Sequence, residues 1–186
     1  TAQYGNRFLW AWHPEGYFVS VATDRYVLES SVPGRALRIV RDAPVIEVPA
    51  ADREAEQAMI TRGMRMTDPG WTWRGPELPS TKPAVAALQI ARDGRIWVRV
   101  ATPSELIPEA EREPPTPNAP PPSVYRESTA YEVFAIDGRF IGRVGFPTAA
   151  QLVEADGDLV WYLVRDSDGL PAVVRARVQP AFPSPP

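Results

Sequence analysis

The sequence predicts an all-β protein made of short antiparallel strands, and three observations lead to that prediction. Apolar and polar residues alternate in short segments along most of the chain, which is the period of a strand with one buried face. Asp-Gly pairs, which favour tight hairpin turns, separate several of these segments. A convincing helical pattern occurs only at residues 51–66.

Residues 88–100 form the clearest hairpin, because two apolar segments flank Asp93 and Gly94. This pair predicts a type I′ turn, in which both central residues have a positive φ. After the turn, alternation places Ile96 on one face of the strand and Trp97 on the other.

The same unit of apolar segment, glycine turn and apolar segment recurs along the chain. Three more Asp-Gly pairs begin at Asp137, Asp156 and Asp168. Further strands are predicted at residues 8–12, 17–22, 26–29, 35–40, 131–136, 139–144, 152–155, 158–164 and 172–178. Repeated four-stranded units of this kind predict a radial repeat, the β-propeller.

The inserted helix predicted at residues 51–66 has the charge distribution that a helix favours. Asp52 is a suitable N-cap, and Arg62 and Arg65 lie near the C-terminal end, where the helix dipole attracts cations. An apolar stripe is formed by Ala55, Met59 and Met66, with Ile60 and Gly63 alongside.

Two loops and a tail interrupt the strand pattern of the predicted propeller domain, residues 1–178. Residues 68–83 are rich in Pro, Gly and Trp and are expected to be irregular. Residues 103–128 include PPTPNAPPPS, which favours extended polyproline conformation, and are expected to form a mobile or surface loop. Residues 179–186 form a proline-rich tail that is expected to be frayed or laid on a partner.

Composition narrows the function classes. The net charge of −3 argues against a nucleic-acid partner and against a polybasic membrane-binding module. The absence of cysteine excludes disulfides, thiolate zinc sites and a cysteine nucleophile. No apolar run approaches the roughly 20 residues of a membrane-spanning helix.

The order and spacing of the hairpins resemble the C-terminal blades of bacterial six-bladed β-propeller proteins related to NHL-repeat propellers. The resemblance is carried by residues 82–100, which include ARDGRIWVRV, by YEVFAIDGRFIGRV at 131–144, and by residues 152–178. It implies four-stranded antiparallel blades and an exported, extracytoplasmic protein. In closed propellers of this kind a strand from the beginning of the chain completes the last blade, and no such strand is identifiable in this sequence. The sequence departs from the family in having only about two to three blades and in its long proline-rich loop at 103–128.

Candidate catalytic and metal-binding residues are few. The lone His13 lies in a His-Pro-Glu-Gly turn, so a turn or rim position is expected rather than a catalytic triad or a His-rich metal site. The resemblance leaves open a metal-dependent propeller hydrolase, such as a lactonase or esterase. Such enzymes use asparagine side chains among their metal ligands, and the only asparagines of this sequence, Asn6 and Asn118, are poorly placed for that role. The Asp-Gly aspartates are explained by turn geometry.

Tryptophans are the most informative side chains for function. Trp71 and Trp73 lie beside Arg74 in a loop, a combination typical of protein interfaces. The alternative for both tryptophans is that they seal the end of the blades or fold back under the loop. Core positions are favoured for the other four, Trp10, Trp12, Trp97 and Trp161.

The sequence therefore predicts a non-catalytic, protein-binding scaffold made of propeller blades, without a metal or other cofactor. The expected partner-binding residues are Trp71, Trp73, Arg74, Pro120, Pro121 and Pro122. One concrete version is an extrinsic subunit that stabilises a bacterial respiratory or photosynthetic membrane complex. A metal-dependent hydrolase and a small-ligand or glycan binder remain the alternatives.

Overall fold

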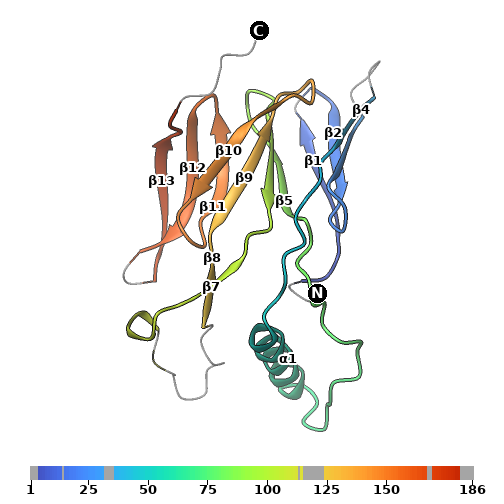
Figure 1. Ribbon diagram of the computed structural model, residues 1–186, viewed down its shortest axis with the longest axis vertical. Helices are drawn as coiled ribbons and strands as arrows, with labels where there is room; N and C mark the ends of the chain where they lie inside the picture. Colours follow the sequence, from blue (N-terminus) through green and yellow to red (C-terminus); the bar gives the residue numbers. More distant parts are fainter. Residues whose placement is uncertain are drawn as a thin grey trace. The chain divides into compact units, whose positions relative to one another are not determined.

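The computed structural model describes residues 4–13, 15–31, 36–112, 114, 124–166 and 169–180 of the chain. The chain divides into two compact units (Figure 1). We call one the sheet unit, which consists of Asn6–Pro44, Pro83–Thr102 and Ser128–Pro186. We call the other the insert unit, which consists of Thr1–Gly5, Val45–Lys82 and Pro103–Glu127. The two predicted loops thus belong largely to one compact unit, which their separate positions in the sequence did not indicate.

The sheet unit contains three antiparallel sheets. The first sheet has the order β1 (Phe8–His13), β2 (Tyr17–Ala22), β3 (Val27–Ser30) and β4 (Leu37–Val40). The second contains β5 (Val85–Ile90), β6 (Ile96–Val100), β9 (Thr129–Phe134) and β10 (Phe140–Phe146). The third contains β11 (Gln151–Asp156), β12 (Leu159–Arg165) and β13 (Pro171–Arg177). The predicted all-β fold with antiparallel four-stranded sheets is confirmed.

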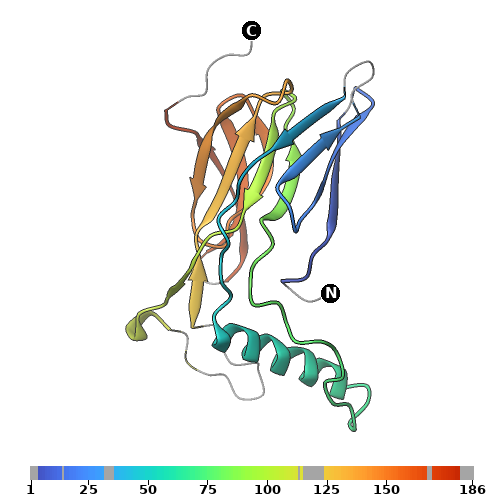
Figure 2. The same cartoon turned by 45° about the vertical axis from the view of Figure 1, so that its right-hand side comes forward.

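The second sheet lies between the first and the third (Figure 2), and the alternation of β6 explains how. Ile96 and Val98 face a core shared with the first sheet, whereas Trp97 faces a core shared with the third. Both faces of the second sheet are therefore buried, and the two faces predicted for β6 each have a partner.

The hairpin turn after β5 differs from the predicted type I′ turn. The backbone N–H of Gly94 donates to the carbonyl of Ala91 at 2.9 Å, and the N–H of Ala91 donates to the carbonyl of Arg95 at 2.9 Å. Gly94 has a φ of +80°, whereas Asp93 is not among the described residues with positive φ. This is the three-residue loop of a type I turn closed by a glycine bulge. The Asp93 carboxylate supports it by accepting the N–H of Arg95 at 3.1 Å.

Gly138 occupies the equivalent position between β9 and β10, where two separate features exclude a side chain. Its φ is +88°, which residues other than glycine rarely adopt. A Cβ atom at this position would also lie 2.8 Å from Cδ1 of Leu37. The glycine thus allows the turn to pack closely on β4.

The predicted core positions of Trp10 and Trp12 are wrong. These side chains are 63% and 59% exposed, while Trp97 is fully buried as predicted and Trp161 is half-buried. The reason is that alternation along β1 directs Leu9 toward the core of the first sheet and its aromatic neighbours away from it.

The insert unit contains helix α1 (Ala50–Arg65), the short strands β7 (Ser104–Leu106) and β8 (Tyr125–Glu127), and the 3₁₀ turn η1 (Glu109–Glu111). The helix is where the sequence predicts it, but its N-cap is Pro49 rather than Asp52, which lies inside the first turn. The expected apolar stripe is not a buried face: Glu56 is the buried residue of α1, and Met59 is 49% exposed.

The predicted loops are partly ordered by pairing at their ends. Residues 68–83 are irregular apart from one antiparallel bridge between Thr81 and Glu47. The loop at 103–128 begins and ends in the β7–β8 pair, and its centre, including Pro120, Pro121 and Pro122, lies outside the described residues. Within the described part of the chain, no helix is both long and apolar enough to cross a membrane.

Candidate functional site

The loop that follows α1 holds Trp71 in place through backbone hydrogen bonds. The carboxylate of Asp68 accepts the N–H of Gly70 at 3.1 Å, and the carbonyl of Asp68 accepts the N–H of Trp71 at 3.0 Å. The Arg65 Nε at the end of α1 donates to the carbonyl of Trp71 at 2.9 Å. The loop is therefore tied to the helix end rather than extended freely from it.

The two loop tryptophans contact each other. Their rings meet edge to face, with centroids 6.1 Å apart, and Nε1 of Trp73 donates to the carbonyl of Pro76 at 3.2 Å. Both tryptophans are half-buried, whereas Arg74 is exposed. Each indole therefore supports the loop, as the fold-back alternative predicts, and still presents a face to solvent.

All three methionines of the protein lie exposed at or near the C-terminal end of α1. Met59, Met64 and Met66 are 49%, 45% and 85% exposed. Exposed methionines are typical of surfaces that adapt to a partner, since the side chain is flexible and polarizable. We call Met59, Met64 and Met66 together with Trp71, Trp73 and Arg74 the helix–loop surface. Sequence reasoning missed the methionines because a stripe of this kind usually faces a core.

A groove runs between the N-terminal half of α1 and the tryptophan loop. Its volume is about 390 Å³. Its lining residues are Ala50, Arg53, Glu54, Gln57, Trp73, Gly75, Glu77 and Leu78. An indole next to several charged and amide groups can stack on a flat apolar surface of a ligand while the polar groups bind its hydroxyls.

An ion-paired cluster lies at the centre of the insert unit. The buried ammonium of Lys82, the only lysine of the chain, lies 2.6 Å from a carboxylate oxygen of Glu127 and donates to Oγ of Ser104 at 2.8 Å. Burial raises the pKa of Asp52, and Lys82 opposes that rise. Burial and the charge of Asp52 raise the pKa of Tyr4 to about 12. This cluster joins α1, the strand pair and the end of the tryptophan loop, so its first role is structural.

His13 lies at the turn that ends β1, as the sequence predicts, and its side chain is buried. Its ring stacks on Tyr17 with centroids 4.4 Å apart, and its Nδ1 accepts the N–H of Glu15 at 3.1 Å. Within the described residues, His13 Nε2 and the Tyr17 hydroxyl have no hydrogen-bond partner. The Glu15 carboxylate lies 4.0 Å from Nδ1, but among the described residues no nucleophile is hydrogen-bonded to Nε2, as a catalytic triad would require.

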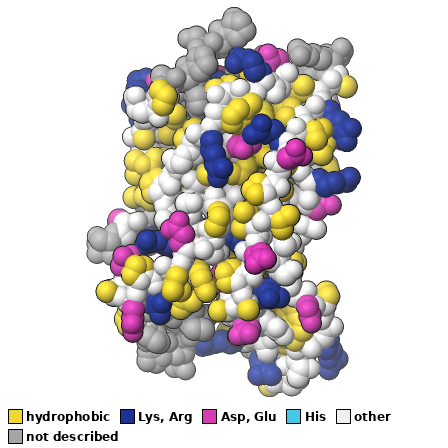
Figure 3. Space-filling model, viewed as in Figure 1, with side chains coloured by type: hydrophobic (Ala, Val, Ile, Leu, Met, Phe, Trp, Pro, Cys, Tyr) yellow, Lys and Arg dark blue, Asp and Glu magenta, His cyan; other side chains and the backbone are white. Residues whose placement is uncertain are grey.

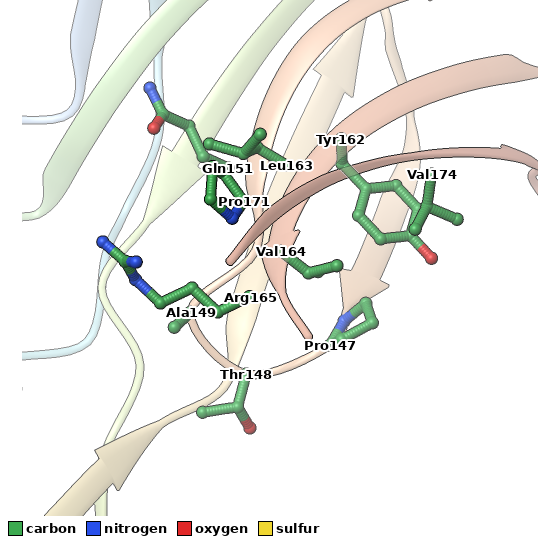
Figure 4. Close-up of a pocket in the computed structure, with 10 residues that line it drawn as sticks. All are labelled: Pro147, Thr148, Ala149, Gln151, Tyr162, Leu163, Val164, Arg165, Pro171 and Val174. Atoms are coloured by element: carbon green, nitrogen blue, oxygen red, sulfur yellow. The ribbon is translucent and has the colours of Figure 1, made fainter. Parts of the chain in front are cut away.

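A second groove, of about 540 Å³, lies beside the third sheet (Figure 4). Gln151 and Arg165 lie on one side of it and Tyr162 on the other, with Pro147 and Thr148 at the turn before β11. The Arg165 Nη1 already donates to the carbonyl of Gly169 at 2.7 Å, which holds the guanidinium toward the sheet's own turn.

Two of the described turn aspartates accept backbone hydrogen bonds. Asp137 accepts the N–H of Arg139 at 3.0 Å, and Asp166 accepts the N–H of Leu170 at 2.9 Å, as turn residues do. Among the residues with described positions, no group of three or more His, Cys, Asp or Glu side chains could hold a metal ion. On the face shown in Figure 3, basic and acidic side chains are interspersed with hydrophobic ones.

Comparisons of this chain with known protein families, with curated proteins and with solved structures find no match. Inference about its function therefore depends on the geometry of the chain's own residues.

Proposed function

We propose that this chain is a non-catalytic, protein-binding segment of a β-propeller, and that the insert unit carries the partner-binding surface. The propeller arrangement is supported by three antiparallel sheets that follow one another along the chain and pack face to face. The chain supplies the surface for a partner on loops inserted between and within these sheets, which is where binding residues commonly lie.

One observation carries the protein-binding proposal: the insert unit leaves all three methionines of the chain exposed on or just after α1, and the loop that follows holds two tryptophans that are only half-buried. Several large apolar side chains that stay exposed within one short segment are a frequent feature of binding surfaces. The hydrogen bond from Arg65 to Trp71 fixes the loop on the helix, so less conformational entropy is lost when a partner binds.

The proposed partner is an integral-membrane assembly, with this chain as an extrinsic subunit on its extracytoplasmic side. That part of the proposal depends on the resemblance to exported bacterial propeller proteins. A respiratory or photosynthetic complex would fit it.

The test is co-purification from native membranes in mild detergent. Met66→Glu combined with Arg74→Glu places acidic groups on the exposed part of the helix–loop surface, and we expect the partner to be lost. Trp71→Ala with Trp73→Ala should have the same effect if the β-rich circular dichroism is unchanged. The matched control is Val45→Glu, which changes a residue of the same unit that is 79% exposed and lies outside the surface. Retention of the partner by both surface variants would refute the proposal.

A second candidate function is favoured by the groove beside Trp73. Arg53, Gln57 and Glu77 line this groove together with Trp73, and polar groups beside an indole are the chemistry that binds a sugar ring. Titration with neutral oligosaccharides, followed by tryptophan fluorescence, tests this function directly. A signal that Trp73→Ala abolishes and Trp10→Ala leaves unchanged would support it, and no signal with any sugar would exclude it.

A further inference from the structure

The outward face of β1 presents an unbroken row of large aromatic side chains. Phe8, Trp10 and Trp12 are 67%, 63% and 59% exposed, and their strand partner Phe18 opposite Trp12 is 40% exposed. We call Phe8, Trp10 and Trp12 the aromatic row. It lies on the face of the first sheet that is turned away from the second sheet.

The size of the aromatic row matters because single exposed apolar residues need no explanation. A fully buried aromatic side chain covers about 150–250 Å², so three that are about three-fifths exposed present on the order of 400 Å². Standard interfaces take about 800 Å² from each partner. The row alone thus provides roughly half of one side of such an interface.

The opposite end of the same stack has a different chemistry. In the third sheet, Trp161 pairs with Arg175 and Leu163 pairs with Val173, so these four side chains share the face turned away from the second sheet. Val173 is 63% exposed, and the Arg175 guanidinium lies 6.0 Å from the centre of the Trp161 ring. We call these four residues the arginine face.

The molecule already packs its sheets with these two kinds of side chain. Between the second and third sheets, the Phe146 ring of β10 and the Tyr162 ring of β12 meet edge to face, with centroids 5.4 Å apart. Between the first and second sheets, the guanidinium of Arg41, which follows β4, lies 4.5 Å from the centre of the Phe140 ring of β10. Contacts of aromatic rings with other rings and with guanidinium groups therefore help to hold the sheet unit together.

We propose that copies of this chain associate head to tail, with the aromatic row of one copy packed on the arginine face of the next. The contact continues the face-to-face stacking of the three sheets inside each copy. It is favoured by cation–π and apolar complementarity, because one face supplies indoles and the other supplies guanidinium and aliphatic groups. A head-to-tail contact uses two different faces, so a dimer keeps one free face of each kind and can add further copies.

The first test is sedimentation of the chain from about 1 to 100 µM, the range in which a non-obligate interface of this kind associates. The expected result is a mass that rises with concentration to that of a dimer and then beyond it. A chain that remains monomeric throughout this range overturns the proposal.

Charge variants of the aromatic row then identify the face that it contacts. Trp10→Arg with Trp12→Arg should weaken association at least about 100-fold, because two buried anchors are lost and like charges face each other. The variant Trp10→Glu with Trp12→Glu loses the same two indoles, but its new carboxylates would face the arginine of the next copy. It should therefore associate measurably better than the variant with two new arginines. Equal loss in both variants would contradict an arginine face as the partner. Leu106→Arg, at a residue that is 58% exposed in the insert unit, is the matched control and should not change the mass.

Mixing two variants, each with one of the two faces disrupted, distinguishes head-to-tail association from association of two identical faces. The Trp10→Arg and Trp12→Arg chain keeps its arginine face, and a chain with Val173→Asp and Arg175→Glu keeps its aromatic row. Each should be monomeric alone, and an equimolar mixture should form a 1:1 dimer that grows no further, because only one contact is intact. A Val173→Asp and Arg175→Glu chain that still dimerises alone would show that the aromatic row pairs with itself, which overturns the head-to-tail contact. Unchanged circular dichroism of each variant excludes misfolding as the cause.

These variants leave the helix–loop surface intact. Failure of self-association and failure of partner binding by the insert unit are therefore distinguishable results.

Discussion

The sheet unit and the insert unit have different interiors. Between the sheets, the two core clusters consist of apolar and aromatic residues, and Val98 and Phe134 are fully buried there. The charged Arg95 is also buried in the sheet unit, where it pairs with Asp93 at 3.3 Å. In the insert unit, the ammonium of Lys82 and the side chain of Glu56 are buried alongside a few apolar residues. An apolar core is stabilised by area removed from water, whereas an ion-paired core depends on every charge keeping its partner. The insert unit is therefore the more easily disturbed of the two.

Removing a large core side chain from the sheet unit should have the largest effect. Trp97→Ala deletes a fully buried indole that packs on Tyr131 and Phe146, and we expect a loss of about 3–5 kcal/mol of unfolding free energy. Urea denaturation measures it, and hydrogen exchange should rise in β6, β9 and β12. A loss below about 1 kcal/mol would mean that this core is not what holds the sheets together.

Breaking the ion pair should affect the insert unit alone. Lys82→Met leaves Glu127 and Asp52 without their cation, and we expect a loss of about 1–3 kcal/mol, since Glu127 keeps some access to water. Hydrogen exchange should rise in α1 and β8 while β6 and β9 remain protected. The control is Lys82→Met with Glu127→Gln, which removes one of the stranded charges and should recover part of the loss. No recovery would argue that Lys82 acts through packing rather than charge.

A matched pair of tyrosines tests single polar groups inside the sheet unit. The Tyr26 hydroxyl donates to Glu132 at 2.9 Å, and burial followed by the Glu132 charge raises the pKa of Tyr26. Tyr26→Phe should cost about 1–2 kcal/mol, because the bond goes to a charged acceptor. Tyr17→Phe removes a hydroxyl that has no hydrogen-bond partner among the described residues and should be neutral or slightly stabilising. Thermal unfolding measures the stability of the two variants. Equal losses of stability would contradict the inference that only the Tyr26 hydroxyl makes a stabilising hydrogen bond.

The smallest effect should come from pH acting on Asp52. Burial raises the pKa of Asp52 above 3.8, so the folded chain binds this proton more tightly than the unfolded chain does. The contribution of Asp52 to stability therefore falls as pH rises from 3.8 through the folded pKa. Asp52→Asn should raise stability at pH 7 by less than about 1 kcal/mol, and the difference should shrink in acid. A variant that is less stable at pH 7 would show that the attraction between Asp52 and Lys82 outweighs burial.

The sequence predicted the strands well where a period of two and a nearby glycine act together. Residues 88–100 and 131–144 became hairpins because alternation and turn residues specify the same local structure. The type I′ turn at Asp93 was wrong because an Asp-Gly pair also fits a type I turn with a glycine bulge, and the Asp93 carboxylate stabilises that alternative. The N-cap at Asp52 was wrong because the helix begins at Ala50, and Asp52 lies in its first turn, where an acidic side chain is also favoured.

The candidate site was only partly predictable. The sequence predicts Trp71, Trp73 and Arg74 as partner-binding residues from their spacing in one loop, and that role stays a prediction; the structure adds the groove and the hydrogen bond from Arg65 that positions the loop. The exposure of Met59 and Met66 was not foreseeable, because the sequence pattern of an apolar helical stripe is the same whether or not another element packs against it.

By itself, the sequence determined local structure: antiparallel strands, their turns and one helix, since these depend on residues a few positions apart. Only the tertiary structure decided which faces are covered. Alternation gives every strand two faces, but burial of Trp97 and exposure of Trp10 depend on whether another sheet packs there. The pairing of Lys82 with Glu127 was decided in the same way, because 45 positions of chain separate two charges that only folding brings together.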